Sequence, residues 1–561
     1  QADLVPCLNC RHSWLAFEGQ TSTMAASLDV SAPAQASTST SAAASGVLWL
    51  IGGVLRVIVA VCVALPTYLV ALPLLLLLRL LVFIAFEVPC QIASCILGGR
   101  QEVHREAMRV EDSFMLMETP TNRCNIVAQL ELSGPTLDVE SLRQLWEKTF
   151  LVRLSGPTAD GSSADPERGR APFLSLRWPR FRQRPVRSFG TWYWEDMGNS
   201  FDLESHVQEL HGVSDKESLA AALANLQSEP MSRERPLWDA WLAKPGLAGS
   251  SLSGRSGGST LLVRVHHAMG DGVSLSRVLL EGISGSWKLG LSGAANVGHK
   301  GSGSGMAAAA KVGLTILLTP LLSVQQLLLP KDRGDLKPRE LSGKKQAALA
   351  SPIPLDRVKA VAKAHGSTIT AVTSACFARA LARTFTPSGS GTKFWLPVSL
   401  SAARGNDEAV LQNDLCFLMM PLALQASSAS EALRVADQRI RDVKSSVEAP
   451  ALLRVIQASL FLLPLPVADF LLNFIGDKAS GVLSSLPGPV APVKWDGYRV
   501  ESIAFLVPQR SNFAVGLSAM SYNGSLQVAV CGDAAALREP AKVADGWQTA
   551  LRELEAEAAR R

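Results

Sequence analysis

Residues 260–272 read TLLVRVHHAMGDG, and this stretch gives the first indication of the fold. The run at 260–265 is apolar and rich in β-branched residues, which predicts a buried strand. His266 and His267 follow at its end. Because side chains alternate along a strand, we expect the two imidazoles to point to opposite faces, so that only one of them can face a given cleft.

The residues after the histidines predict a sharp turn and a helix. Asp271-Gly272 is a turn signal, and the apolar spacing of residues 273–283 is typical of a helix. A histidine can take a proton from a hydroxyl at neutral pH, and an aspartate four residues on could fix its tautomer or hold the loop. No serine or cysteine accompanies the motif as a nucleophile. This favours direct attack by a substrate hydroxyl over an acyl-enzyme route.

Two other interpretations of the histidine pair remain open at this point. The histidines could be metal ligands, although neighbouring strand residues chelate poorly and no further cluster of His, Cys or Glu stands nearby in the sequence. They could also be polar residues of an ordinary turn, because short motifs match by chance.

Composition limits the class of protein. The chain has 561 residues, enough for two domains with appendages, and 47% of them are hydrophobic. Mean hydropathy is +0.18, which indicates membrane contact. The net charge of +5 suits an anionic small substrate or an anionic membrane surface but not nucleic acid. The densest basic stretch, 177–187, is interpreted as a solvated strand or loop. The nine scattered cysteines predict reduced thiols.

Shifts in composition divide the chain into five parts. Residues 1–23 precede Met24 and are interpreted as possible untranslated upstream sequence. The Ala/Ser/Thr-rich stretch after Met24 predicts disorder. The expected parts are a disordered tail (1–46), a membrane-anchoring segment (47–98), an N-terminal domain with the histidine motif (105–290), a linker with a hydrophobic helix (291–350) and a C-terminal domain (351–556).

The anchoring segment holds 22 consecutive residues without a charge, at 57–78. About 20 apolar residues span a bilayer as a helix. Pro66 and Pro73 interrupt the run, so a kinked helix, a re-entrant hairpin and two short passes all remain open. The arginines that follow the segment predict that the C-terminal bulk of the chain faces the cytosol.

The sequence contains two further apolar stretches and one clear turn signal. Residues 312–330 are predicted to break at Pro320, and either contact the membrane or pack on the protein. For residues 452–475 we prefer a core or tunnel-lining helix over membrane contact. Tyr522-Asn523-Gly524 predicts a hairpin turn.

The motif and its flanks also carry a family resemblance. HHAMGDG is similar to the active-site signature of acyltransferases related to chloramphenicol acetyltransferase. Over residues 110–556, the chain resembles the wax ester synthase/diacylglycerol acyltransferase family. The matching stretches are RWPRFRQR (177–184), WYWEDMGNSFDLESHV (192–207), RPLWDAWL (235–242), STITAVTSACFARAL (367–381), LPVSLSAARG (396–405), LQNDLCFLMMPL (411–422), LPGP (486–489) and GLSAMSYNGSLQVAVCGD (516–533).

The chain departs from the family pattern at two positions. Ser485 stands where the family commonly has Asn, two residues before Pro-Gly-Pro, and Gln412 stands where it usually has Gly. The Gly/Ser-rich insertions and the long N-terminal hydrophobic segment are additions to the pattern.

The resemblance implies a fold and roles for five residues. The fold is an α/β (α+β), two-domain chloramphenicol-acetyltransferase-like acyltransferase fold, with the active site in a channel between the domains. His267 would be the general base, and His266 would orient its loop. Asp271 would be structural, Gly272 would allow the turn, and Asn413 is the candidate donor to the thioester oxyanion.

The resemblance also implies the reaction. We expect an acyl-CoA-dependent O-acyltransferase that esterifies a fatty alcohol to a wax ester, diacylglycerol to triacylglycerol, or both. Acyl-CoA is a co-substrate, and no other cofactor and no metal are expected. The expected location is the endoplasmic reticulum membrane with the catalytic part facing the cytosol; a lipid droplet or the plasma membrane are the other candidates. The alternatives are a small-metabolite alcohol or amine as acceptor, and a non-catalytic membrane-anchored lipid-binding protein.

Overall fold

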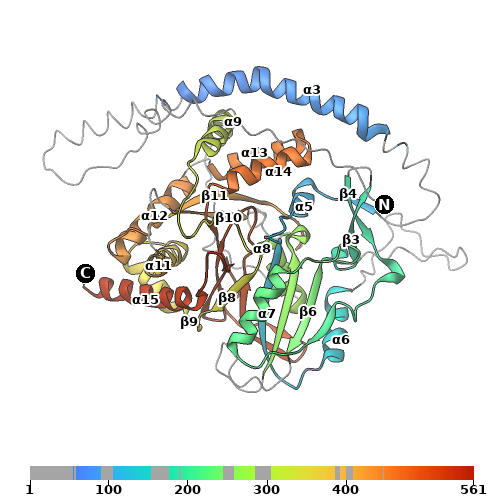
Figure 1. Ribbon diagram of the computed structural model, residues 1–561, viewed down its shortest axis with the longest axis vertical. Helices are drawn as coiled ribbons and strands as arrows, with labels where there is room; N and C mark the ends of the chain where they lie inside the picture. The colour runs from blue at the N-terminus through green and yellow to red at the C-terminus, as the bar shows by residue number, and fades with distance from the viewer. Residues whose placement is uncertain are drawn as a thin grey trace, which may run out of the picture. The chain divides into compact units, whose positions relative to one another are not determined.

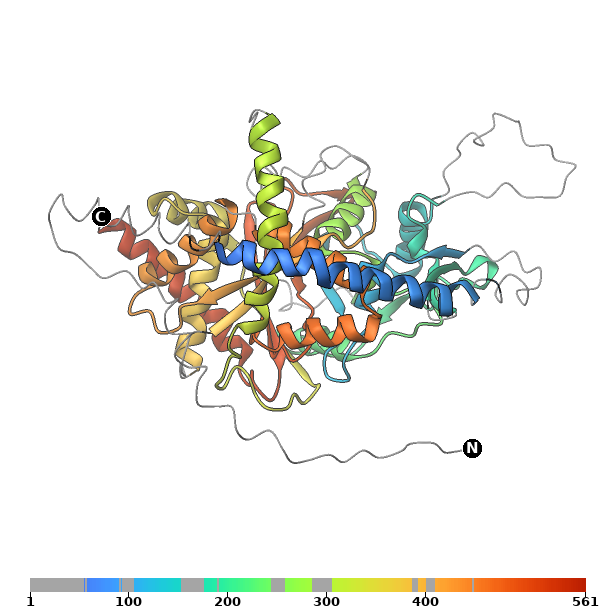
Figure 2. The ribbon, with the colours of Figure 1, turned by 90° about the horizontal axis from the view of Figure 1, so that it is seen from above.

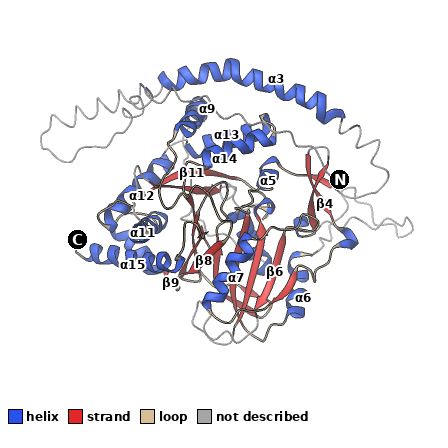
Figure 3. Cartoon of the chain, viewed as in Figure 1, coloured by secondary structure: helices blue, strands red, loops and turns tan. Residues whose placement is uncertain are grey.

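The computed structural model describes residues 55, 58–89, 92, 105–152, 176–188, 191–243, 258–284, 305–385, 392–399, 409–445 and 448–560. Their contacts place residues 60–561 in one compact unit. Two β-sheets covered by helices make up its centre (Figures 1 and 3). Residues 1–46, the predicted disordered tail, lie outside the described residues.

The first sheet carries the histidine motif. Its strand order is β13-β14-β2-β7-β6-β5. The strands are β2 (Asn125–Ser133), β5 (Val207–Leu210), β6 (Trp238–Ala243), β7 (Ser259–His266), β13 (Lys494–Trp495) and β14 (Tyr498–Leu506). The helices of this part are α5 (Val110–Met115), α6 (Val139–Phe150), α7 (Lys216–Ser228) and α8 (Gly272–Ser284). The expected strand at 260–265 and the expected helix at 273–283 are confirmed.

The second sheet has the order β11-β10-β12-β15-β16-β8, and β9 pairs with β16. Its strands are β8 (Lys345–Leu349), β9 (Ile353–Pro354), β10 (Thr392–Ser399), β11 (Leu415–Leu422), β12 (Gly481–Pro487), β15 (Val515–Tyr522) and β16 (Ser525–Asp533). One face packs on α10 (Leu355–Ala364), α11 (Ile369–Thr384), α12 (Ala429–Ser445) and α15 (Pro540–Ala559). Asn523 and Gly524 have φ of 48° and 72°, so the predicted hairpin turn joins β15 to β16.

The C-terminal half of the sequence contributes two strands to the first sheet. Strand β14 comes from the C-terminal half of the sequence but pairs antiparallel with β2, with Leu506 opposite Val127. Strand β13 extends the same sheet. A third, small sheet has the order β1-β4-β3 and consists of β1 (Arg105–Ala107), β3 (Gln183–Ser188) and β4 (Thr191–Asp196). The C-terminal half therefore completes the sheet that holds the histidines.

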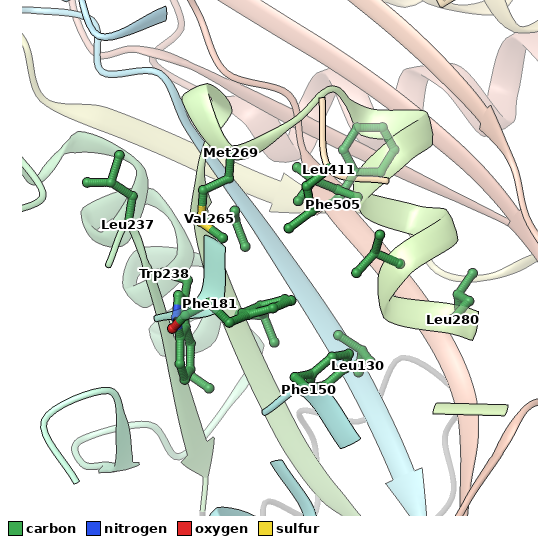
Figure 4. Close-up of a cluster of buried hydrophobic side chains, with 14 of the residues drawn as sticks. Leu130, Phe150, Phe181, Leu237, Trp238, Val265, Met269, Leu280, Leu411 and Phe505 are labelled. Carbon is green, nitrogen blue, oxygen red and sulfur yellow. The ribbon is translucent and has the colours of Figure 1, made fainter. Parts of the chain in front are cut away.

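An aromatic cluster in the core packs beside the turn that carries His267. The rings of Trp146 and Trp238 stack with centroids 4.9 Å apart. Phe150 and Phe181 close the same cluster, and Met269, directly after the turn, reaches into the core with no exposed surface (Figure 4). Burying side chains of this size contributes about 1.5–3 kcal/mol each. The backbone that carries His267 is thus fixed to the core.

The apolar N-terminal segment forms one long helix. It runs from Ile58 to Ala85, which is long and apolar enough to cross a membrane, and it is not buried within the unit. Of the possibilities left open by the prolines, the structure therefore shows a single helix and neither a re-entrant hairpin nor two short helices. A π-helical turn, Thr67–Ala71, lies between Pro66 and Pro73, and α3 (Leu72–Val82) follows it. A widened turn of this kind accommodates proline without ending the helix.

The prediction that residues 312–330 break at Pro320 is wrong. Helix α9 (Gly305–Leu328) runs through this proline. A proline has no N–H to give to the carbonyl four residues before it, which here is that of Ile316. The hydroxyl of Tyr68 donates to this carbonyl at 2.6 Å. The long N-terminal helix therefore satisfies the group that the proline leaves unpaired.

The stretch 452–475 is two helices, α13 (Glu448–Leu462) and α14 (Leu465–Gly476). Pro464 separates them because it fixes the backbone of the intervening turn. One face of the pair is buried, and Phe461 and Phe470 on the other are exposed. No residue of this stretch lines the cavity described below. The preferred interpretation as a core or tunnel-lining helix is thus wrong for the exposed face.

Candidate active site

Strand β7 delivers the two histidines to different environments. His266, its last residue, is buried, and its Nδ1 accepts from the N–H of Ala268 at 3.0 Å. Its Nε2 therefore carries the proton and lies 3.2 Å from Oε1 of Glu118. Burial raises the pKa of Glu118, but the hydrogen bonds from His266 and from the N–H of Cys124, together with the charge of Arg123, leave that pKa lowered. These contacts let His266 hold the turn from inside the protein.

His267 opens a 3-10 turn, His267–Met269, and lines the cavity. Its Nδ1 lies 2.9 Å from Oδ1 of Asn413. An amide oxygen can only accept, so Nδ1 carries the proton and Nε2 keeps its lone pair. Burial lowers the pKa of His267, opposed by the charge of Asp271. The imidazole is therefore neutral at neutral pH.

Asn413 is almost fully buried, and both of its amide hydrogens are used. Its Nδ2 donates to Oδ1 of Asp112 at 2.9 Å and to the carbonyl of His267 at 2.9 Å. The expected role as donor to an oxyanion needs an available N–H, and this arrangement leaves none. Asn413 instead fixes the orientation and tautomer of His267.

Asp112 is a site residue that sequence reasoning missed. Its Oδ1 also accepts the backbone N–H of Asn413 at 3.0 Å, and its Oδ2 pairs with Arg180 at 2.8 Å. Arg180 in turn donates to the carbonyl of Met269 at 2.7 Å. Burial raises the pKa of Asp112, and Arg180 opposes this. The motif itself carries no signal for this partner, because Asp112 lies in a different segment.

The basic stretch 177–187 is not a solvated surface as predicted. Arg180, Phe181 and Gln183 are buried, and Arg177 forms an ion pair with Glu281 of α8. Arg180 pairs with the buried carboxylate of Asp112, whereas Arg187 at the end of the stretch is exposed.

Asp271 joins the turn to both halves of the chain. Its Oδ1 accepts from the backbone N–H groups of Val273 and Ser274 at 3.1 and 2.8 Å, which caps the start of α8. Its Oδ2 accepts from the hydroxyl of Ser399 and the N–H of Asp414. Asp271 thus links the histidine turn to the start of α8 and to the C-terminal half of the chain.

Gly272 and Gln412 also lie where the histidine turn contacts the C-terminal half of the chain. A Cβ added at Gly272 would stand 3.2 Å from Cδ1 of Leu486 on β12, a contact that the leucine side chain would have to yield to. Gln412, which replaces the family's Gly, accepts the N–H of Asp271 at 3.0 Å and the hydroxyl of Ser274 at 2.7 Å through its carbonyl. These two bonds use only the backbone of Gln412, so the substitution leaves them intact, and its side-chain Oε1 accepts from Arg109 at 2.9 Å.

His267 faces a cavity of about 630 Å³. Its walls are mainly apolar. The N-terminal half contributes β2, β7 and α8, and the C-terminal half contributes β10, β11, β12, β14 and β15. Lys359 and Arg439 are the cationic groups among the described lining residues. Arg439 is bound to Glu448 by two hydrogen bonds, whereas Lys359 is half exposed and contacts Asp356 at 3.4 Å.

Within the described ranges, no group of three or more His, Cys, Asp or Glu side chains is placed to hold a metal ion. The cysteines of these ranges are unpaired thiols: Cys62, Cys124, Cys376, Cys416 and Cys531. Cys7, Cys10, Cys90 and Cys95 lie outside the described residues.

Solved structures define the class of protein. The wax ester synthase/diacylglycerol acyltransferase from Marinobacter aquaeolei VT8 is 21% identical, and the match covers 81% of this chain and 99% of that chain with a TM-score of 0.54. The trichothecene 15-O-acetyltransferase from Fusarium sporotrichioides is 12% identical, with 80% and 94% covered and a TM-score of 0.53. The chain therefore has the two-domain α/β fold of chloramphenicol-acetyltransferase-like acyltransferases.

Sequence relatives narrow this class to a family. The model of the wax ester synthase/diacylglycerol acyltransferase catalytic domain matches residues 157–286, and the model of the family's C-terminal domain matches residues 411–555. A protein of Mycobacterium tuberculosis named "putative diacylglycerol O-acyltransferase" is 24% identical over 79% of this chain and 88% of its own length. A protein of Mycobacterium bovis with the same kind of name is 26% identical over 75% and 84%. The chain belongs to the wax ester synthase/diacylglycerol acyltransferase family and is an O-acyltransferase.

Proposed function

We propose that this protein transfers a fatty acyl group from acyl-CoA to the hydroxyl of a lipid alcohol, with His267 as general base. The acceptor is a fatty alcohol, diacylglycerol or both. The observation that carries the proposal is the Nε2 lone pair of His267, held by the contact between Nδ1 and Asn413 at the wall of an apolar cavity. An apolar cavity of this size suits acyl chains rather than polar metabolites.

His267 is the only proton carrier that the proposed reaction needs. The acceptor hydroxyl gives its proton to Nε2 while its oxygen attacks the thioester carbonyl carbon, so a C–O bond forms. The tetrahedral intermediate then collapses, the C–S bond breaks, and the imidazolium returns the proton to the leaving thiolate. The Asn413 oxygen stabilises the imidazolium through Nδ1 without taking the proton.

The thioester oxygen needs a hydrogen-bond donor while it carries negative charge. Ser484 on β12 is buried and lines the cavity, and its hydroxyl has no hydrogen-bond partner within the described residues. Strand alternation puts Ser484 on the same face as Leu486, which packs against Gly272 in the histidine turn. Ser484 is therefore our candidate oxyanion donor in place of Asn413.

The cavity also offers a position for the anionic part of acyl-CoA. Lys359 of α10 lines it together with Thr368, the N-cap residue of α11. A lysine beside a helix N-terminus attracts phosphate groups. We place the phosphates of acyl-CoA beside Lys359, with the thioester extended toward His267. Since acyl-CoA is cytosolic, the proposed location is the cytosolic face of the endoplasmic reticulum or a lipid droplet, which the apolar helix at Ile58–Ala85 supports.

The test is an acyltransferase assay on membranes from cells that make no storage lipid. Labelled palmitoyl-CoA is offered with diacylglycerol or with hexadecanol, using wild type, His267→Ala and the control His365→Ala, which changes a histidine that contacts the carbonyl of Leu554 on α15. We expect labelled triacylglycerol or wax ester from wild type and the control, and none from His267→Ala. Absence of both products from folded wild type, with label in a small alcohol or amine, would refute the lipid acceptor.

A further inference from the structure

Helices α13 and α14 expose large apolar side chains to one side. Phe470 is 67% exposed and Phe461 58%, and Val467 and Phe474 lie beside them on the same surface. Positions 467, 470 and 474 recur at helical spacing, so they form one face of α14. We refer to Phe461, Val467, Phe470 and Phe474 as the α14 patch. No residue of this patch lines the catalytic cavity.

The α14 patch continues into α9. Helix α9 packs on α13 and α14 and exposes further apolar side chains. These are Leu314, Ile316, Val324, Leu327 and Leu328. A contiguous apolar surface of this extent is uncommon on a soluble monomer and marks a contact with another apolar phase.

The N-terminal helix lies along this same surface (Figures 1 and 2). Two hydrogen bonds hold it there, and each fills a carbonyl that helix geometry leaves open. Tyr68 donates to Ile316, the carbonyl left by Pro320, and Arg79 donates to Phe461 at 3.1 Å, in the last turn of α13. The helix at Ile58–Ala85 is thus fitted to the body rather than appended to it.

Cations border the aromatic side chains. The Arg79 guanidinium lies 5.9 Å from the ring centroid of Phe461, and the Lys331 ammonium lies 5.9 Å from that of Phe474. Lys331 is half exposed and pairs with Asp477 at 2.9 Å, and the Lys478 ammonium lies 4.5 Å from the ring centroid of Phe474, so lysines outnumber the carboxylate beside this ring. Aromatic rings flanked by Arg and Lys are typical of the boundary between acyl chains and headgroups, and cations there favour anionic lipids.

We propose that α9, α13 and α14 form a second membrane-contacting surface, continuous with the N-terminal helix, and that its occupant is a phospholipid bilayer with anionic headgroups. The bilayer is favoured over a protein partner because the surface continues a helix apolar enough to cross a membrane. The inference deepens the proposed function and rests on it for the lipid acceptor that such a bilayer would hold. The first test below needs no turnover.

The first test is photocrosslinking of the full chain reconstituted in vesicles of zwitterionic and anionic phospholipids that carry labelled acyl chains. The photoreactive residue p-benzoylphenylalanine replaces Phe470, or Val152 as an exposed apolar control far from the patch in sequence. We expect label on the protein from position 470, more of it as the anionic fraction rises, and background label from position 152. Equal label at both positions, or a crosslinked band of two copies at position 470, would overturn the proposal.

The second test separates this proposal from the proposed function. Phe470→Ser with Phe474→Ser is compared with Val152→Ser for two acceptors, diacylglycerol in vesicles and a short-chain alcohol in solution. We expect at least a five-fold loss with diacylglycerol and less than two-fold change with the soluble acceptor. Unchanged activity with vesicles would overturn the surface, whereas an inactive wild type would count against the proposed function and leave the crosslinking result to decide the surface.

Discussion

The Nδ1 atom of His267 lies 2.9 Å from Oδ1 of Asn413, although 146 residues separate the two in the chain. Asp112, from a third segment, holds the amide of Asn413 through two hydrogen bonds. Three distant segments therefore decide which nitrogen of His267 carries the proton. The orientation of the proposed base is a property of the assembled protein and not of the HHAMGDG loop.

The pH dependence of activity should reflect the environment of His267. Burial lowers the pKa of His267 below its ordinary value of about 6.5, and only the neutral form can accept a proton. We expect kcat/KM to fall on the acid side with a midpoint below about pH 6.5. A profile measured with a stability check at each pH tests this. An acid limb centred at or above about pH 6.5 would contradict it.

Asp112 should act on kcat through Asn413. In Asp112→Ala the amide loses its acceptor, so the imidazole is held less well, and we expect kcat to fall roughly ten- to hundred-fold with little change in KM. Asp112→Asn keeps an acceptor oxygen and should recover part of the loss. Thermal unfolding is measured alongside, because Arg180 loses its partner. Equal changes in kcat and KM, or no rescue by Asn, would argue for a merely structural role.

Removal of the Ser484 hydroxyl should lower kcat by about 10²–10³, the usual effect of losing one oxyanion donor. Ser484→Thr retains a hydroxyl and should recover part of the rate. Ser502→Ala on β14 is the matched control, since Ser502 is another buried serine whose hydroxyl has no hydrogen-bond partner within the described residues, and it is not among the cavity-lining residues. If Ser502→Ala costs as much as Ser484→Ala, the assignment of the donor is wrong.

Reversal of the charge at Lys359 should weaken binding of acyl-CoA. For Lys359→Glu we expect KM for acyl-CoA to rise roughly ten-fold, equivalent to about 1.4 kcal/mol, with kcat unchanged. The effect should shrink as salt screens the charges. Lys542→Glu, on α15 and not among the cavity-lining residues, is the control. A change in KM for the alcohol instead would move the phosphate site elsewhere.

His266 should matter for stability. In His266→Ala, Glu118 loses one of the partners of its carboxylate and the Ala268 N–H loses its acceptor, which we expect to cost about 1–3 kcal/mol of unfolding free energy. Because the pKa of Glu118 is lowered in the folded state, its contribution is present above its unfolded value of about 4.3 and is lost as pH falls through the folded value. The difference between wild type and variant in urea unfolding should therefore narrow in acid. A difference independent of pH would contradict this.

The local patterns of the sequence determined much of this protein. Strand β7, helix α8 and the Asn523-Gly524 turn follow from periodicity and turn chemistry, since short-range sterics decide them. The HHAMGDG motif and its flanks were sufficient to indicate the acyltransferase family, which the comparisons confirm. Composition was likewise sufficient to identify the apolar helix at Ile58–Ala85.

Long-range contacts decided the rest. The sequence placed a break at Pro320, but Tyr68, 248 residues from Ile316, supplies the missing donor and the helix continues. It placed Arg180 on the surface, but Asp112 offers a buried counter-charge. It gave Asn413 an available amide, but Asp112 and His267 use both hydrogens. In each case the expectation from local sequence failed because a residue distant in sequence binds the polar group concerned. Only the tertiary structure shows which residue that is.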